Sequence, residues 1–252
     1  MSDTAPSPPP SVDVVIPCYN EVTVLEGSIR RTLDLLAGHP EYVWRVVIAD
    51  NGSTDGTSEL ARRLESEHPD QVKALVLTIK GRGLALKQAW TTSTADIVSY
   101  MDVDLSTDIE HLPGLVGKVA HGGCDIAIGS RRAKGSQTER SIKREITSRG
   151  YIFLIRGTFP SLKITDAQCG FKALSRRAAD AIVPDIQNRM WFFDTEMLIL
   201  AQRRGFRICE MPVRWDEDPD TKVKIFKTAR EMVQGLARMR FSRDAEPVSR
   251  QG

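Results

Sequence analysis

Short apolar runs alternate with helical patterns along residues 12–129, and this alternation constrains the fold more than any other feature of the sequence. Each run is short enough for a buried strand, and Pro17, Asp50 and Asp102, which favour turns, directly follow three of them. Alternating strands and helices predict a mostly parallel sheet with helices on both faces, which is the α/β class. The predicted strands are 12–16, 44–49, 72–77, 97–101 and 126–129, and the predicted helices are 22–36, 57–67, 84–91 and 109–120.

The pattern is less regular after residue 129. We expect a basic loop to about Lys143, then a helix ending near Arg156. Further strands are expected at 172–174 and 207–210, and further helices at 176–183, 195–204 and 223–241. A length of 252 residues suits one large α/β domain, and no internal repeat or linker divides it. We therefore expect a disordered Pro-rich tail at 1–11, one domain at 12–241 and a flexible tail at 242–252.

Polar side chains follow the predicted strands at the points where those strands end. Ligands of parallel α/β sheets bind beyond the carboxyl ends of the strands, so these residues are the first candidates for a functional site. They are Asn20, Glu21, Asp50, Lys80, Asp102 and Asp104. Asn20 is also a candidate N-cap for the helix that follows it.

Asp102 and Asp104 form the sharpest local motif. Carboxylates at i and i+2 project to the same side of an extended chain, where their mutual repulsion favours a neutralising cation. A hard divalent ion, Mg²⁺ or Mn²⁺, shared with the oxygens of a diphosphate would supply it. The alternative is a pair of solvated turn acids, with Asp104 capping the next helix. Because the pair follows a buried strand, we predict a metal site.

Three other features leave two interpretations open. Asp50 either accepts a hydrogen bond from a ribose or base, or forms the Asn51–Gly56 turn. The Lys80–Gly83 segment can contact a phosphate or base, although it matches neither the dinucleotide-binding nor the Walker pattern. Asp194 and Glu196 are either carboxylates at a reaction centre or residues of a helix start, with Asp194 or Thr195 as its cap.

Charge and cysteine content narrow the classes of partner. The net charge is only +2, which gives no reason to expect a nucleic acid ligand. Residues 131–177, however, hold twelve Lys and Arg against three acids, which indicates an anionic ligand there. The four cysteines are widely spaced and suit no zinc site, so we expect reduced, mostly buried thiols in a cytoplasmic protein. No apolar run approaches the roughly 20 residues of a membrane-spanning helix.

Several motifs together resemble family 2 glycosyltransferases of the GT-A fold. They are Ile16-Pro-Cys-Tyr-Asn-Glu21, Ala49-Asp-Asn-Gly-Ser-Thr-Asp-Gly-Thr57, Asp102-x-Asp104 and Gly129-Ser-Arg131. Later motifs are similar to the polyprenyl-phosphate branch, which includes dolichyl-phosphate mannose synthases and glucosyltransferases. These are Arg144-x-x-x-Ser148-Arg149, Asp166-x-x-Cys-Gly-Phe-Lys172, Phe193-x-x-Glu196 and Met211-Pro-Val213. The resemblance covers about residues 12–239.

The resemblance implies a role for each matching position. The base and ribose of the donor would lie against Pro17, Asn20, Glu21 and Asp50, with Lys80 and Arg82 nearby. Asp102 and Asp104 would hold Mg²⁺ or Mn²⁺ on the donor diphosphate. The acceptor phosphate would bind Arg131, Arg144, Ser148 and Lys222.

The expected activity is the inverting transfer of a hexose from a UDP- or GDP-sugar to a polyprenyl phosphate. The alternative keeps fold and donor but uses a soluble hydroxyl acceptor, with Asp194 as general base. A sugar nucleotidyltransferase would need a Gly-rich loop after the first strand, where this chain has Pro17-Cys-Tyr-Asn-Glu21. The basic helix near 223–241 either touches the cytoplasmic membrane face through Val223, Phe226, Val233, Leu236 and Met239 or packs these residues on the domain.

Overall fold

Strands and helices alternate from β1 to β5, as the apolar pattern predicts. The computed structural model describes residues 8–139, 142–216 and 225–241, and for 139, 142–147 and 225–227 it describes the backbone alone. The strands are β1 (Ser11–Cys18), β2 (Val43–Asn51), β3 (Val72–Leu77), β4 (Ile97–Met101), β5 (Ile126–Ser130), β6 (Gln137–Glu139), β7 (Phe171–Ser175), β8 (Ile208–Pro212) and β9 (Arg214–Asp216). The helices are α1 (Leu25–Ala37), α2 (Thr57–Glu67), α3 (Arg82–Thr92), η1 (Ile109–His111), α4 (Leu112–Ala120), α5 (Ile142–Thr158), α6 (Arg176–Ile182), η2 (Val183–Asp185), α7 (Phe193–Arg203) and α8 (Ile225–Phe241).

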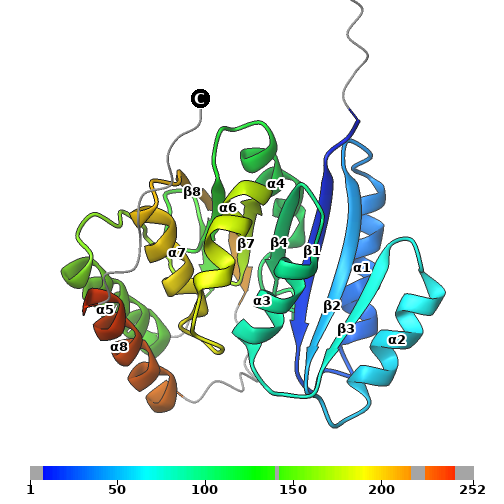
Figure 1. The fold of residues 1–252 in the computed structure, drawn as a ribbon, viewed down its shortest axis with the longest axis horizontal. Helices are drawn as coiled ribbons and strands as arrows, with labels where there is room; N and C mark the ends of the chain where they lie inside the picture. Colours follow the sequence, from blue (N-terminus) through cyan, green and yellow to red (C-terminus); the bar gives the residue numbers. More distant parts are fainter. Residues whose placement is uncertain (1–7, 140–141, 217–224, 242–252) are drawn as a thin grey trace, which may run out of the picture.

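The central sheet is mostly parallel, and the predicted α/β class is confirmed. Within the described residues it has seven strands in the order β3-β2-β1-β4-β7-β5-β8 (Figure 1). β1 to β4 run parallel to their neighbours among themselves, and β8 runs parallel to β5. β7 is inserted between β4 and β5 and is antiparallel to both.

The reversed direction of β7 gathers polar loops at one edge of the sheet. Met101, the last residue of β4, pairs with Phe171, the first residue of β7. The residues just before β7 therefore lie at the edge where β1, β2 and β4 end. The chain also crosses from β3 past β1 to β4, so the switch point, where ligands of open α/β sheets bind, lies beside the ends of β1 and β4.

Helices cover both faces of the sheet. One core cluster joins the sheet to α1, α2 and α4, and it contains Ile29, Leu64 and Leu115. The other joins it to α3, α6 and α7, and it extends to α5 and α8. α5 and α8 lie side by side beyond α7, at the end of the molecule away from β3 (Figure 1).

The apolar side chains of α8 that the structure describes pack mainly on the domain. Leu236 and Met239 are buried with α5 and α7 residues, whereas Val233 is 53% exposed. Val223 lies outside the described residues, and the side chain of Phe226 is not described. The packing interpretation therefore holds for Leu236 and Met239. Among the described helices, none is long and apolar enough to cross a bilayer.

Local expectations fail at two helix starts and two short strands. α1 begins at Leu25 with Val24 as its N-cap residue, so Asn20 does not cap it. α7 begins at Phe193 with Phe192 as its N-cap residue, so neither Asp194 nor Thr195 caps that helix. β6 and β9, which pair with each other, were not expected from the sequence, because three residues are too few to show a periodicity.

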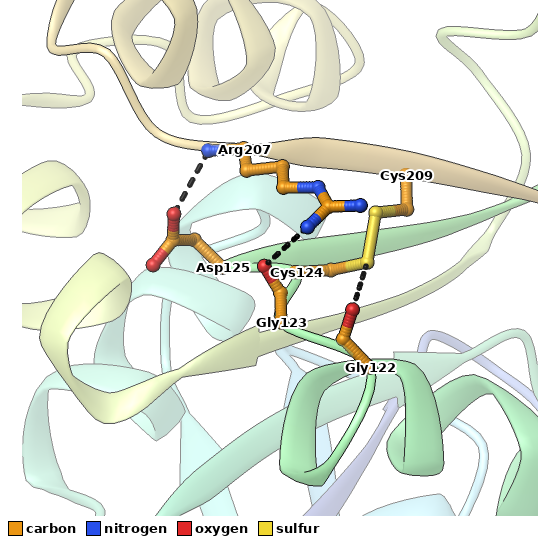
Figure 2. Close-up of a disulfide and its surroundings, with 6 residues drawn as sticks. All are labelled: Gly122, Gly123, Cys124, Asp125, Arg207 and Cys209. Carbon is orange, nitrogen blue, oxygen red and sulfur yellow. Dashed lines mark hydrogen bonds between the residues drawn. A yellow bond between two sulfur atoms is a disulfide. The ribbon is translucent and has the colours of Figure 1, made fainter.

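The expectation of four reduced cysteines is wrong for two of them. Cys124 precedes β5, and Cys209 lies on the neighbouring strand β8, where the two sulfur atoms form a disulfide (Figure 2). Arg207, just before β8, also connects the starts of the two strands, because its backbone N–H donates to a carboxylate oxygen of Asp125, just before β5, at 2.8 Å. Spacing could not show this, because strand pairing joins cysteines 85 positions apart. Cys18 and Cys169 are buried thiols.

Candidate active site

The loops after β1 and β2 are fastened to each other at the donor side of the predicted site. Asn20 has a φ of +56°, and its side-chain oxygen accepts a hydrogen bond from the Thr54 N–H at 2.8 Å. Its own N–H donates to Ser53 Oγ at 2.8 Å, and the Glu21 N–H donates to Thr57 Oγ1 at 2.9 Å. The Ser/Thr-rich turn therefore sets the positions of Asn20 and Glu21 at the end of β1.

Asp50 is fully buried beneath this turn. One carboxylate oxygen accepts from the Ser53 hydroxyl at 2.5 Å and from the Ser53 N–H at 3.1 Å, and the other accepts from the Ser58 hydroxyl. This geometry favours the turn-forming interpretation of Asp50. Pro17 lies inside β1, opposite Ala49 of β2.

Asn51 connects the donor-side loops to the start of α3. Its side-chain N–H₂ donates to the Cys18 carbonyl at 2.7 Å, and its side-chain oxygen accepts from the Gly81 N–H at 3.3 Å. Lys80 lies on the same loop, with its ammonium nitrogen 3.3 Å from the centre of the Tyr19 ring. Lys80 therefore lies against Tyr19, which follows β1, beside the predicted donor positions.

Two carboxylates and two cations form a chain of ion pairs at the switch point. Arg82 contacts Asp102 with a nitrogen–oxygen distance of 2.7 Å and Asp194 with one of 3.1 Å. Lys172 contacts the other oxygen of Asp194 at 2.9 Å. The exposed fraction of the side chain is 0% for Lys172, 5% for Asp194, 12% for Arg82 and 43% for Asp102, so the chain of charges opens to solvent at Asp102.

Asp194 is held as a charged group inside this network. Burial would raise the pKa of Asp194, but Lys172, Arg82 and the hydrogen bond from the Tyr100 hydroxyl outweigh burial and hold it below its ordinary value. Both of its oxygens accept from these groups. A general base must take up a proton from the acceptor, and a buried carboxylate paired with two cations is poorly suited to do so, which argues against that role.

Gly170 creates the space that Asp102 occupies. A Cβ atom built on Gly170 would lie 1.8 Å from one Asp102 carboxylate oxygen and 2.4 Å from its carboxyl carbon. Only glycine leaves room for the carboxylate in this position. Asp104 is exposed in the turn that follows, and one of its oxygens accepts from the Ser106 N–H at 3.0 Å.

The turn that carries both acids is strained, and its donor set suits a hard cation. Leu105 has a φ of +53°, which is rare for a bulky residue and is found most often at functional sites. The described residues contain no cluster of three or more metal-ligating side chains. Mg²⁺ is commonly bound by one or two carboxylates together with substrate phosphates. Asp102, whose carboxylate packs against Gly170, and Asp104 are two carboxylates suited to binding such an ion.

Glu196 lies away from this network and supports the loop before α7. It is buried, and its oxygens accept from the backbone N–H groups of Gln187 at 3.1 Å and Asn188 at 2.9 Å. Arg238 of α8 pairs with it at 2.7 Å. Its contacts are therefore those of a loop-bracing residue.

Arg131, the residue after β5, is fixed by a buried acid. Two of its side-chain nitrogens donate to the two oxygens of Asp166, at 2.6 and 2.9 Å, and its guanidinium lies 5.4 Å from the centre of the Trp215 ring. Glu210 of β8 in turn fixes Asp166, because its carboxylate accepts hydrogen bonds from the backbone N–H groups of Thr165 and Asp166. Much of the hydrogen-bonding capacity of Arg131 is thus used inside the protein.

Ser148 contacts Arg132, an arginine to which the sequence analysis gave no role. The Arg132 guanidinium donates to Ser148 Oγ at 3.4 Å. Lys222 lies outside the described residues, and the side chain of Arg144 on α5 is not described.

The sequence analysis gave no role to Lys172 or Gly170, although both belong to the Cys169-Gly-Phe-Lys172 motif. A lysine predicted on a buried strand was the signal that could have revealed this network.

The Arg131–Asp166 pair predicts a measurable loss of stability in acid. Burial would raise the pKa of Asp166, but Arg131 outweighs it and the pKa is lowered to about 2. A carboxyl with a lowered pKa stabilises the folded state above its ordinary pKa, and this contribution is lost as the pH falls below about 4. Between pH 6 and pH 3 we expect the free energy of unfolding of the native protein to fall by about 1 kcal/mol more than that of Asp166→Asn. Denaturant unfolding at both pH values measures this, and equal slopes would contradict it.

Comparison with known proteins places these residues in a family context. Residues 13–183 match the family described as "Glycosyl transferase family 2". Glycosyltransferase AglD of Haloferax volcanii is 41% identical over 218 residues, which cover 86% of this chain and 35% of AglD. The chain thus spans about a third of that relative. A dolichyl-phosphate beta-glucosyltransferase of Trichomonas vaginalis is 31% identical over 235 residues, with 87% and 69% coverage.

Two further matches extend the comparison. The human dolichyl-phosphate beta-glucosyltransferase is 30% identical over 249 residues, which cover 93% of this chain and 76% of the human protein. Among solved structures, glucosyl-3-phosphoglycerate synthase from Mycobacterium tuberculosis, in complex with Mn²⁺, uridine diphosphate and phosphoglyceric acid, superposes with a TM-score of 0.67. That alignment covers 94% of this chain and 80% of the other at 19% identity, so the likeness concerns the fold. The GT-A fold implied by the sequence is confirmed.

Proposed function

Because the chain belongs to glycosyl transferase family 2, we propose that it transfers a hexose from a nucleoside diphosphate sugar to a polyprenyl phosphate, with inversion at the anomeric carbon. The observation that carries the proposal is the Asp102 carboxylate at the end of β4, seated against Gly170 and paired with Arg82. This is the switch point of the sheet, where ligands of open α/β sheets bind. UDP and GDP are the donor nucleotides that we expect.

The reaction is a single displacement. An oxygen of the acceptor phosphate attacks the anomeric carbon, the bond from that carbon to the donor diphosphate breaks, and the diphosphate leaves with the bonding electrons. A divalent ion held by Asp102 and Asp104 would supply the charge that offsets the leaving diphosphate. The acceptor phosphate is already anionic near neutral pH, so the chain has no proton to remove. Its task is to position two anions against their repulsion.

The basic residues beyond β5 are suited to the acceptor. Arg131, Arg144, Ser148 and Lys222 are the proposed acceptor-phosphate residues, and Arg132 joins them through its contact with Ser148. Asp166 fixes the Arg131 guanidinium, so its remaining donors have a set direction. A lipid acceptor would also require contact with the cytoplasmic face of a membrane, which we propose to be peripheral.

A crossed assay tests the proposal. UDP- and GDP-sugars are each combined with polyprenyl phosphate and with soluble acceptors, including phosphoglycerate, in the presence of Mg²⁺ or Mn²⁺. Sugar transfer to polyprenyl phosphate, without transfer to the soluble acceptors, supports the proposal. Transfer only to a soluble hydroxyl would establish the alternative acceptor class, and Asp194 would then have to leave its ion pairs to act as a base.

Metal dependence gives a second test. Excess chelator should abolish turnover, and added Mg²⁺ or Mn²⁺ should restore it. Asp104→Asn should lower turnover about tenfold or more because it removes one anionic ligand, while an exposed carboxylate contributes little to folding. Glu110→Gln, which removes an exposed acid from the nearby η1, is the matched control. Full turnover in excess chelator would remove the metal from the mechanism.

A further inference from the structure

A carboxylate on α8 caps the start of α7 from outside that helix. One oxygen of Glu231 accepts hydrogen bonds from the backbone N–H groups of Trp191 at 3.0 Å and Phe192 at 3.1 Å. Phe192 is the N-cap residue of α7, where backbone N–H groups lack partners within the helix. Glu231 thus does for α7 what a local capping side chain does for other helices.

Other contacts hold the same loop, residues 187–192, against α8. Arg238 donates to the Gln187 side-chain oxygen at 2.7 Å and pairs with Glu196. Gly235 lets the two elements approach closely, because a Cβ there would lie 2.4 Å from the Phe192 ring. Loop 187–192 is therefore clamped by polar and apolar contacts along one side of α8.

The other side of loop 187–192 supports the start of α3. The Arg189 carbonyl accepts a hydrogen bond from the Leu84 N–H at 3.1 Å. A Cβ on Gly81 would lie 2.9 Å from that carbonyl oxygen, and a Cβ on Gly83 would lie 2.9 Å from the Met190 carbonyl oxygen. The backbone on either side of Arg82 is thus packed against this loop.

Trp191 completes the connection to the active site. The Arg82 guanidinium lies 5.2 Å from the centre of the Trp191 ring, within the range of a cation–π contact. Arg82 in turn pairs with Asp102. A continuous set of contacts therefore runs from Glu231, through Trp191, to the carboxylate that we assign to the donor.

We propose that Glu231 is a positioning residue of the glycosyl transfer site, which holds Trp191 and loop 187–192 so that Arg82 meets Asp102. The helix α8 then belongs to the donor site, although it lies at the far end of the molecule from β3 (Figure 1). The kinetic test rests on the proposed function. The test of how loop 187–192 supports Arg82 does not, because it needs no substrate. Two independent measurements therefore test the proposal.

Hydrogen exchange tests the coupling without any substrate. In Glu231→Ala, the Leu84 amide should exchange at least about tenfold faster, because loop 187–192 loses its anchor. Met239→Ala is the control, since it removes a buried side chain from the same helix without touching the Glu231 contacts. It should leave Leu84 exchange within about twofold of the native rate. Unchanged Leu84 exchange in Glu231→Ala, or equal acceleration in both variants, would overturn the proposal.

Kinetics then test the consequence for the site. With the donor found in the crossed assay, Glu231→Ala should lower kcat/KM for the donor about tenfold. Glu231→Gln should stay within about threefold, because a carboxamide oxygen can still accept both N–H bonds. A loss of the same size in Glu231→Gln or in Met239→Ala would contradict positioning. If no donor supports turnover, the proposed function fails while the exchange result still decides this inference.

Discussion

Replacing Gly170 with alanine should lower turnover at least about a hundredfold while leaving the protein folded. The added Cβ would lie within 1.8 to 2.7 Å of the carboxyl atoms of Asp102, closer than atoms can approach. The Asp102 side chain is partly exposed, so it can turn toward solvent instead of disrupting the strands. It would then leave Arg82 and the position from which it serves the donor.

Initial rates and a thermal melt measure the two halves of this prediction. Gly27→Ala is the matched control, because a Cβ on Gly27 of α1 meets nothing within 4 Å and alanine favours a helix. It should keep native turnover and melt at the native temperature or slightly above. A Gly170→Ala protein with native turnover would show that Asp102 is not needed in its present position.

Asp194→Asn should lower the free energy of unfolding by about 3–5 kcal/mol. Asp194 is the buried acid between Arg82 and Lys172, and its loss removes the ion-pair partner of the fully buried Lys172 ammonium. A buried, unpaired charge is among the most costly changes in a protein interior. Denaturant unfolding of the native and mutant proteins measures the effect.

The double variant Asp194→Asn with Lys172→Met separates this charge effect from other causes. Removing both charges should restore much of the lost stability, because Arg82 keeps Asp102 as its partner. The same folded double variant also tests the acceptor class. With polyprenyl phosphate its rate should fall much less than the 10²–10⁴-fold expected for a lost general base. A larger fall would return Asp194 to a direct catalytic role, and an unrestored double variant would contradict the charge explanation.

Features that depend on neighbouring residues could be predicted from the sequence. The apolar runs and their turn residues predicted β1 to β5 and the helices between them to within a few residues, because side-chain periodicity is a local property. The position of Asp102 after a buried strand placed it at the ligand-binding edge, since parallel strands end on the same side. The GT-A fold followed from the ordered motifs.

Other features were decided only by the tertiary structure, because they join residues far apart in the chain. The antiparallel insertion of β7 brings Gly170 against Asp102, and no local pattern records the direction in which a buried strand enters a sheet. Asp50 had a plausible donor-binding interpretation and Glu196 a plausible catalytic one, and the hydrogen bonds of both are those of residues that support loops.

Contacts between distant residues also decided the roles of Glu231 and of two cysteines. Periodicity gave α8 an apolar stripe, but only packing shows that Glu231 reaches the start of α7 and that Leu236 is buried. The Cys124–Cys209 bond depends on the adjacency of β5 and β8. The sequence by itself determined where most of the strands and helices lie and which polar residues follow them. The tertiary structure decided which of those polar groups meet, because charge pairing and close packing depend on distance in space rather than along the chain.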